Sequence, residues 1–144
     1  MSNFDNYKYL LGDTIINYQL IENDLKMIYA GMLSGDFNDN IDYADKTFHG
    51  LGQIINALQK LDNSDNKPYF SKEDYKILKN LARDRNYYCH QCAIDFGYIQ
   101  NFINSTEYKK NYSKLQSVNT EIKRMQKLTE DFRFEILKKY NRIK

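Results

Sequence analysis

Apolar residues recur along this chain at alternating spacings of three and four, a pattern typical of amphipathic α-helices. Four stretches carry the pattern, which predicts helices over residues 4–32, 41–61, 71–102 and 106–136. No stretch alternates apolar and polar residues over enough positions to predict a β-strand. Helices of this length, each with one apolar face, predict an all-α fold that forms an up-and-down antiparallel bundle of four to five helices.

Local signals mark where these helices begin, weaken and end. Residues 62–70 contain the single proline of the chain and form its clearest loop. Ser71, with Asp74 three residues later, resembles a capping box in which Asp replaces the usual Glu. Gly50 and Gly52 lie inside the second stretch, where each weakens a helix by about 1 kcal/mol relative to alanine.

The composition favours one globular domain. A length of 144 residues predicts a single domain over residues 1–144, and 42% hydrophobic with 28% charged residues is typical of a folded protein. No apolar run approaches the ~18 residues of a membrane span, and the N-terminus lacks the features of a secretory signal. Two cysteines three residues apart cannot form a disulfide framework, which favours a reduced, cytoplasmic setting.

Positive charge gathers toward the C-terminus. Residues 105–144 hold 11 Lys and Arg against five Asp and Glu, a net charge of +6. The remaining residues hold 10 against 14, a net charge of −4. A basic segment beside an acidic body is compatible with binding a polyanion. The alternative is a solvated helix face with no binding role.

One arginine interrupts the apolar stripe of the third helix. Arg85 occupies a position between Ala82 and Cys89, which lie one turn to either side. A guanidinium in a packed stripe is costly unless it is paired, reaches water or lines a cleft. Such an exception to the local pattern is expected at a functional site. The alternative is an ion pair with a carboxylate of a neighbouring helix, namely Glu22, Asp24 or Asp45.

The neighbours of Arg85 form a candidate site for phosphodiester chemistry. Around the helix, His90 lies about 40° from Asn86 and about 20° from Arg83. Arg85 lies on the flank, about 140° from His90, and its long side chain can reach toward the same space. Imidazole suits proton transfer near neutral pH, and the planar guanidinium group matches phosphate oxygens. The sequence has no serine-based triad, no phosphate-binding glycine loop and no carboxylate cluster for a metal, so we expect no metal or cofactor.

The segment Arg85-Asn86-Tyr87-Tyr88-Cys89-His90 resembles the signature of the HEPN (higher eukaryote and prokaryote nucleotide-binding) superfamily. That signature is an arginine, four to six residues, and then a histidine, frequently with Asn or Asp directly after the arginine. The resemblance implies a small helical bundle, often a metal-independent ribonuclease that acts as a homodimer with both motifs lining a shared cleft. It also implies a toxin or antiphage effector with RNA as substrate and an antitoxin or regulatory protein as partner.

The resemblance gives roles to Arg85, Asn86 and His90 as catalytic residues. His90 is expected to take the proton from a ribose 2′-OH, which attacks the adjacent phosphate, while Arg85 stabilises the charge that builds on the phosphate oxygens. Asn86 is expected to orient the imidazole or the phosphate, and Arg83 to be an auxiliary substrate contact. The expected product is a 2′,3′-cyclic phosphate, and DNA, which lacks the 2′-OH, is not expected to be cut.

Two non-enzymatic alternatives stay open at this point. One is a HEPN-like module that only binds a partner protein or a nucleotide, and the other is a helical scaffold that self-associates through its last helix. One departure from the family also bears on regulation. A HEPN subgroup paired with nucleotidyltransferase antitoxins has tyrosine two residues after the histidine, where this chain has Cys92. We therefore expect no control through modification of that tyrosine.

Overall fold

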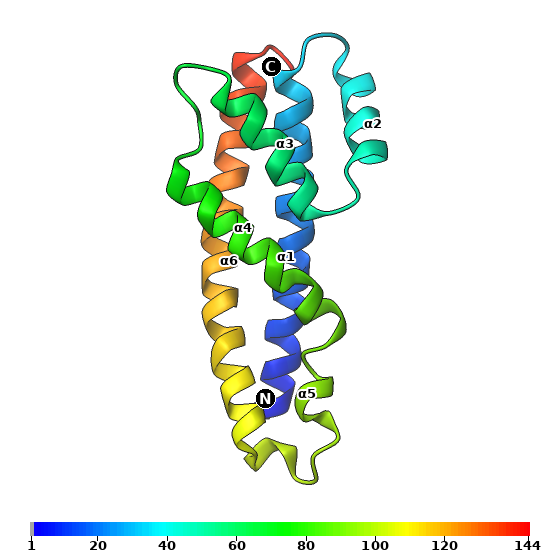
Figure 1. The fold of residues 1–144 in the computed structure, drawn as a ribbon, viewed down its shortest axis with the longest axis vertical. Coiled ribbons are helices and arrows are strands. Elements are labelled where there is room, and N and C mark those ends of the chain that lie inside the picture. Colours follow the sequence, from blue (N-terminus) through cyan, green and yellow to red (C-terminus); the bar gives the residue numbers. More distant parts are fainter. Residues whose placement is uncertain (1) are drawn as a thin grey trace.

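The computed structural model describes residues 2–144 and is all-helical over that range, with no β-strand (Figure 1). This confirms the predicted fold class. It contains six α-helices and one short 3₁₀-helix, slightly more than the four to five helices predicted. The elements are α1 (Asn3–Met32), α2 (Phe37–Thr47), α3 (Leu51–Asn63), α4 (Lys72–His90), α5 (Ile94–Gly97), η1 (Phe102–Asn104) and α6 (Thr106–Lys139). None of the helices in this range is long and apolar enough to cross a lipid bilayer.

The two longest helices, α1 and α6, lie side by side and run in the same direction (Figure 1). The Tyr7 hydroxyl donates a hydrogen bond to Asn111 Oδ1 at 2.7 Å, and the Thr129 hydroxyl donates one to Asp24 Oδ2 at 3.0 Å. The two pairs are separated by 104 and 105 residues of sequence, and a nearly constant separation requires parallel helices. The expectation of purely antiparallel neighbours is therefore wrong for this central pair.

The parallel arrangement follows from a break in the second predicted helix. The stretch predicted as one helix over 41–61 is divided into α2 and α3 by Phe48, His49 and Gly50. Gly50 is the N-cap residue of α3 and provides no side-chain hydrogen bond to it. The break adds one reversal of chain direction, so that the final helix points the same way as the first (Figure 1).

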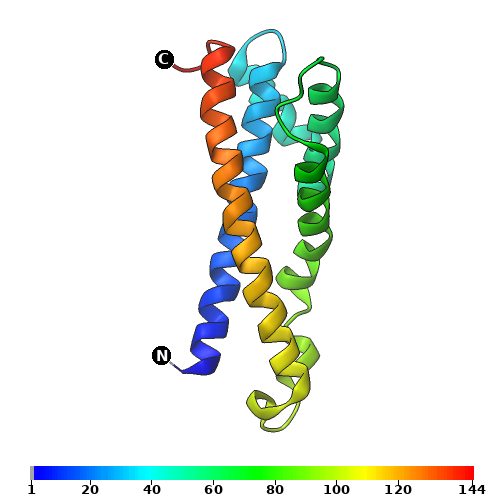
Figure 2. The same ribbon diagram turned by 90° about the vertical axis from the view of Figure 1, so that its left-hand side faces the viewer.

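The helices form two layers. Seen from the side in Figure 2, α1 and α6 make one layer, and α3 and α4 cover one of its faces. α2 packs beside α1. Fully buried aliphatic side chains from four helices fill the space between the layers, including those of Ile21, Leu25, Leu58, Leu78 and Ile122.

One buried carboxylate fixes the turn from α3 to α4. Asp62 accepts hydrogen bonds from the backbone N–H groups of Tyr69 and Phe70 at 2.8 and 3.1 Å, and from the Tyr75 hydroxyl at 2.6 Å. The predicted capping box is confirmed, since the side chains of Ser71 and Asp74 each accept a hydrogen bond from the other's backbone N–H. These bonds set the start of α4 relative to the end of α3.

The third predicted helix ends earlier than expected. It was predicted to reach residue 102, but α4 ends at His90. There the Tyr87 carbonyl accepts hydrogen bonds from the backbone N–H groups of both Gln91 and Cys92, so the last α-helical bond is followed by a wider one that ends the helix. Asp95 then accepts hydrogen bonds from the Tyr87 hydroxyl and the Gln91 amide, at 2.8 and 2.9 Å, which hold the following segment back against α4. His90 is consequently a helix-terminal residue.

Candidate functional site

Three of the four predicted site residues share one exposed face of α4. Arg83, Asn86 and His90 follow one another at spacings of three and four residues, and all three are exposed. The helical geometry predicted for them therefore agrees with the structure over residues 83–90, the C-terminal part of α4. Their common face is solvent-accessible, which an interaction with a large substrate requires.

Arg85 lies on a different flank of α4, facing α1. Its side chain is half-buried, and its charge acts on the hydroxyl of Tyr18, a residue of α1 that is 1% exposed. Burial raises the pKa of Tyr18, the nearby Asp84 carboxylate raises it further, and the Arg85 guanidinium opposes this shift. No hydrogen bond links Arg85 to Asn86 or His90 within residues 2–144, so one chain does not by itself assemble the predicted catalytic group.

The predicted alternative, an ion pair between Arg85 and a carboxylate of a neighbouring helix, does not form among the described residues. Among the described residues, no carboxylate lies within ion-pair distance of Arg85, and its guanidinium donates no hydrogen bond. The three carboxylates considered from the sequence are paired elsewhere: Asp24 with Arg133, and Glu22 and Asp45 with Lys26. A half-buried guanidinium without an anionic partner is costly in a folded protein, which keeps Arg85 a candidate for binding an anion.

Arg83 lines a groove of about 610 Å³ between α3 and α4, hereafter the α3–α4 groove. Its α3 wall is formed by Gly52, Asn56 and Gln59. Its α4 wall is formed mainly by cationic side chains: Lys72, Lys76, Lys79 and Arg83. Of these four residues, only Arg83 was predicted from the sequence as a substrate contact. The signal for the lysines was the spacing of four, three and four residues that joins them to Arg83, on a flank of α4 about 110° from the apolar stripe.

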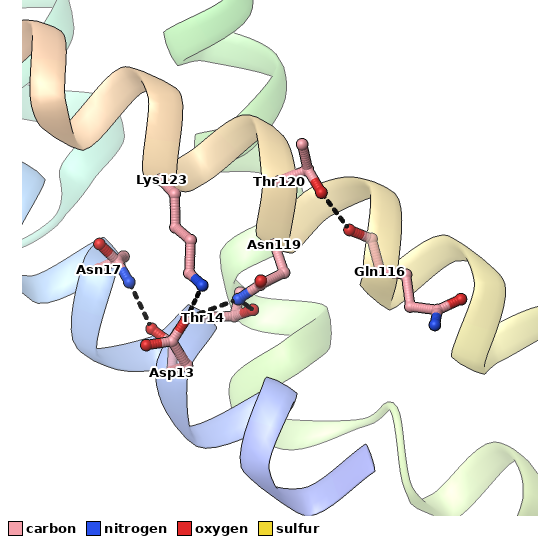
Figure 3. A network of polar contacts seen from close by, with 7 residues as sticks. All are labelled: Asp13, Thr14, Asn17, Gln116, Asn119, Thr120 and Lys123. Carbon is pink, nitrogen blue, oxygen red and sulfur yellow. Dashed lines mark hydrogen bonds and ion pairs between the residues drawn. The ribbon is translucent and has the colours of Figure 1, made fainter. Parts of the chain in front are cut away.

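The basic C-terminal segment, by contrast, uses much of its charge within the chain. Lys123 pairs with Asp13 at 3.3 Å, and Asn119 donates hydrogen bonds to Asp13 and Thr14 at the same point (Figure 3). Three further ion pairs join Arg124 with Glu121, Lys127 with Asp131, and Arg133 with Asp24. Of the 11 cations in residues 105–144, four are thus paired with carboxylates of the same chain.

Comparisons with protein-family models, with curated proteins and with solved structures find no match to this chain. Within the described part of the chain, no three His, Cys, Asp or Glu side chains are grouped closely enough to hold a metal ion. The site therefore has to be interpreted from its own residues.

Proposed function

We propose that this protein is a metal-independent endoribonuclease of the HEPN type. The observation that carries the proposal is the half-buried Arg85, which lacks an acidic partner among residues 2–144 and lies one and a half turns from the exposed His90. A guanidinium available to a phosphate and an imidazole available to a hydroxyl proton are the groups that RNA cleavage by its own 2′-OH requires.

The proposed reaction is an internal transesterification. His90 takes the proton from a ribose 2′-OH, and the 2′ oxygen forms a bond to the adjacent phosphorus. The bond from phosphorus to the 5′ oxygen breaks, and that oxygen takes a proton from water as it leaves. Arg85 and Arg83 stabilise the negative charge on the phosphate oxygens, and Asn86 orients the phosphate or the imidazole. The products are a 2′,3′-cyclic phosphate and a 5′-hydroxyl end.

The separation of Arg85 from His90 favours a site completed by two copies of the chain. The two side chains lie on different faces of α4, so we propose a homodimer in which one copy supplies a phosphate-binding arginine near the histidine of the other. In the cell, such an enzyme would act as a toxin or an antiphage effector under the control of an antitoxin or regulatory protein. These biological roles follow from the resemblance of the motif.

Incubation of the purified protein with total RNA in the presence of EDTA tests the proposal. His90→Ala and Arg85→Ala are expected to lose cleavage by on the order of 100-fold or more, since a general base contributes about 10²–10⁴. His49→Ala is the matched control, because His49 is the other histidine of the chain and is also exposed. Cleavage that persists unchanged in the His90 and Arg85 variants would end the proposal.

A second candidate function is a non-catalytic helical module that binds a partner protein or a nucleotide. The observation that favours it is the open surface around Asn86 and His90, both of which are exposed at the end of α4. Binding of a nucleotide at the exposed end of α4, by a wild-type protein that cleaves no RNA, would assign this function in place of the first.

A further inference from the structure

The α3–α4 groove has a continuous cationic wall. Four exposed side chains of α4 form it, hereafter the α4 ridge: Lys72, Lys76, Lys79 and Arg83. Residues three and four positions apart on a helix have Cβ atoms about 5–6 Å apart, so the ridge presents a charge at every turn. Its eleven-residue span corresponds to about 16 Å along the helix axis. A row of evenly spaced cations complements a linear polyanion.

The charges of the α4 ridge have no anionic partner among the described residues. Its three lysines form no ion pair or side-chain hydrogen bond there, and Arg83 donates only to the neutral carboxamide of Asn80. No residue that lines the groove carries a carboxylate. The acid nearest in helical spacing is Glu73, three residues before Lys76, and it forms no ion pair with that lysine. Cations held together without counter-charges focus a positive potential in the groove.

The opposite wall of the groove supplies neutral polar groups. Asn56 and Gln59 carry carboxamides, whose N–H groups are donors of the kind that phosphate oxygens and base edges accept. Gly52 leaves the backbone of α3 open to the groove, because a Cβ atom there would meet no other atom within 4 Å. Gly52 lies in the first turn of α3, whose N-cap residue contributes no side-chain hydrogen bond. The backbone N–H groups of this turn add to the positive potential.

The α4 ridge leads directly to the candidate catalytic residues. Asn86 and His90 follow Arg83 at spacings of three and four residues, so the same helix face extends from Lys72 to His90. Its length is about 27 Å, which matches about eight stacked nucleotides at 3.4 Å each. A positively charged groove that follows one backbone is typical of proteins that bind single-stranded nucleic acid.

We infer that the α3–α4 groove binds the phosphate backbone of single-stranded RNA and guides it along α4 to His90. The choice of RNA among polyanions rests on the proposed ribonuclease function, whereas the backbone-binding role rests on the groove itself. Each cation of the ridge contacts a phosphate, and the carboxamides of α3 contact the same strand from the other side. Binding of this kind is electrostatic and depends strongly on salt.

Fluorescence anisotropy with a labelled twelve-nucleotide RNA tests the groove apart from catalysis. Every ribose of this probe carries a 2′-O-methyl group, so the nucleophile is blocked and binding alone is measured. Gly52→Glu is expected to raise Kd by at least about tenfold at low salt, since it adds a negative charge inside the groove. Gly12→Glu is the matched control, because Gly12 is another helical glycine at which a Cβ atom meets nothing within 4 Å. It is expected to leave Kd within about twofold of wild type.

The salt dependence of binding identifies which cations contact phosphates. Lys76→Gln/Lys79→Gln is expected to reduce the slope of log K against log salt by about 1.4, because each contact to a single strand contributes about 0.7. Lys109→Gln/Lys110→Gln removes two exposed lysines of α6 and is expected to leave the slope unchanged. Thermal unfolding of each variant verifies that it is folded.

The outcomes separate the groove from the catalytic proposal. The groove proposal would be overturned if the wild-type protein did not bind the probe. It would also be overturned if the Gly52→Glu and Lys76→Gln/Lys79→Gln variants bound it as tightly as the wild type. Equal affinity for a polyglutamate of the same length would also overturn it, by reducing the interaction to unspecific charge attraction. Groove-dependent binding without cleavage of unmodified RNA would support the groove and refute the nuclease.

Discussion

The two basic regions of the molecule, α6 with its C-terminal extension and the ridge on α4, use their positive charges differently. Of the 11 cations in residues 105–144, seven contact groups of the same chain: Lys114, Lys123, Arg124, Lys127, Arg133, Lys139 and Arg142. The α4 ridge has fewer charges, but they face a groove without carboxylates. The difference shows that charge density along the sequence is a poor guide to a binding surface. The better guide is the set of cations that have no partner within the folded chain.

The charges of α6 help to hold it parallel to α1. At the end of the pair, the Arg142 guanidinium, which follows α6, donates hydrogen bonds to three carbonyl oxygens, that of Gly31 in the last turn of α1 and those of Leu33 and Gly35 just after it, at 3.2, 2.6 and 2.9 Å. These bonds satisfy carbonyls that the end of a helix leaves without partners. The polar contacts between the helices also repeat in one register, which opposes sliding of α6 along α1.

Reversal of charge on the α4 ridge is expected to have the largest effect on RNA affinity. Lys76→Glu/Lys79→Glu is expected to weaken RNA binding on the order of 100-fold at low salt, because two favourable phosphate contacts become repulsive. The melting temperature should change little, since neither lysine has a partner to lose within residues 2–144. Lys109→Glu/Lys110→Glu on α6 is the control. An equal loss of binding in both double variants would place the RNA on α6 as well.

Removal of the Arg142 side chain tests whether the C-terminal cations stabilise the contact between α1 and α6. Arg142→Ala is expected to lower the free energy of unfolding by about 2 kcal/mol, because three charge-assisted hydrogen bonds to backbone carbonyls disappear. RNA binding should remain within about twofold of wild type. Urea denaturation measures the first quantity and anisotropy the second. A loss of RNA binding with unchanged stability would reverse the roles assigned to the two regions.

Two glycines of α1 provide a smaller test of how closely α1 and α6 approach. A Cβ atom at Gly31 would lie 2.5 Å from Leu137 Cδ2, so Gly31→Ala is expected to cost about 1–2 kcal/mol. Gly12→Ala meets no atom within 4 Å and should instead stabilise α1 by about 1 kcal/mol. Urea denaturation compares the two variants. Stabilisation by both alanine substitutions would contradict the close packing of Gly31 against Leu137.

The smallest expected effect is the contribution of Asp24, at the α1–α6 contact, to the pH dependence of stability. Burial raises the pKa of Asp24 above its ordinary 3.8, although the hydrogen bond from Thr129 and the charge of Arg133 oppose the shift. The folded state therefore retains a proton that the unfolded state releases, and this contribution to stability is lost as pH rises from about 3.8 through the raised pKa. Asp24→Asn should accordingly gain stability relative to wild type as pH rises through this window.

Asp95 provides a control of opposite sign. Hydrogen bonds from Gln91 and Tyr87 lower the pKa of Asp95, so its contribution to stability is present above the ordinary pKa and is lost as pH falls. Asp95→Asn should therefore lose stability relative to wild type as pH rises. Urea denaturation at a series of pH values measures both differences. Stability differences that change in the same direction with pH in both variants would contradict these causes, burial for Asp24 and hydrogen bonding for Asp95.

Much of the local structure could be predicted from the sequence. The apolar spacing of three and four predicted an all-α chain, and the Ser71–Asp74 box predicted the start of α4. The angular positions of Arg83, Asn86 and His90 on one face also followed from their spacing. The end of α4 at His90 was missed, because the side-chain bonds of Asp95 that turn the chain have no periodic signal.

The sequence by itself determined which segments are helical and which faces of them are apolar, because helix periodicity and capping depend on residues within a few positions of one another. That α1 and α6 run parallel is decided only at the tertiary level, because the direction of α6 depends on whether one helix or two lie between α1 and α4. The tertiary structure also decided which cations stay free. Lys123 meets Asp13 and Arg133 meets Asp24 across more than a hundred residues of sequence, whereas the lysines of α4 face neutral groups of α3. Such pairings depend on which helices pack together, and no local pattern encodes them.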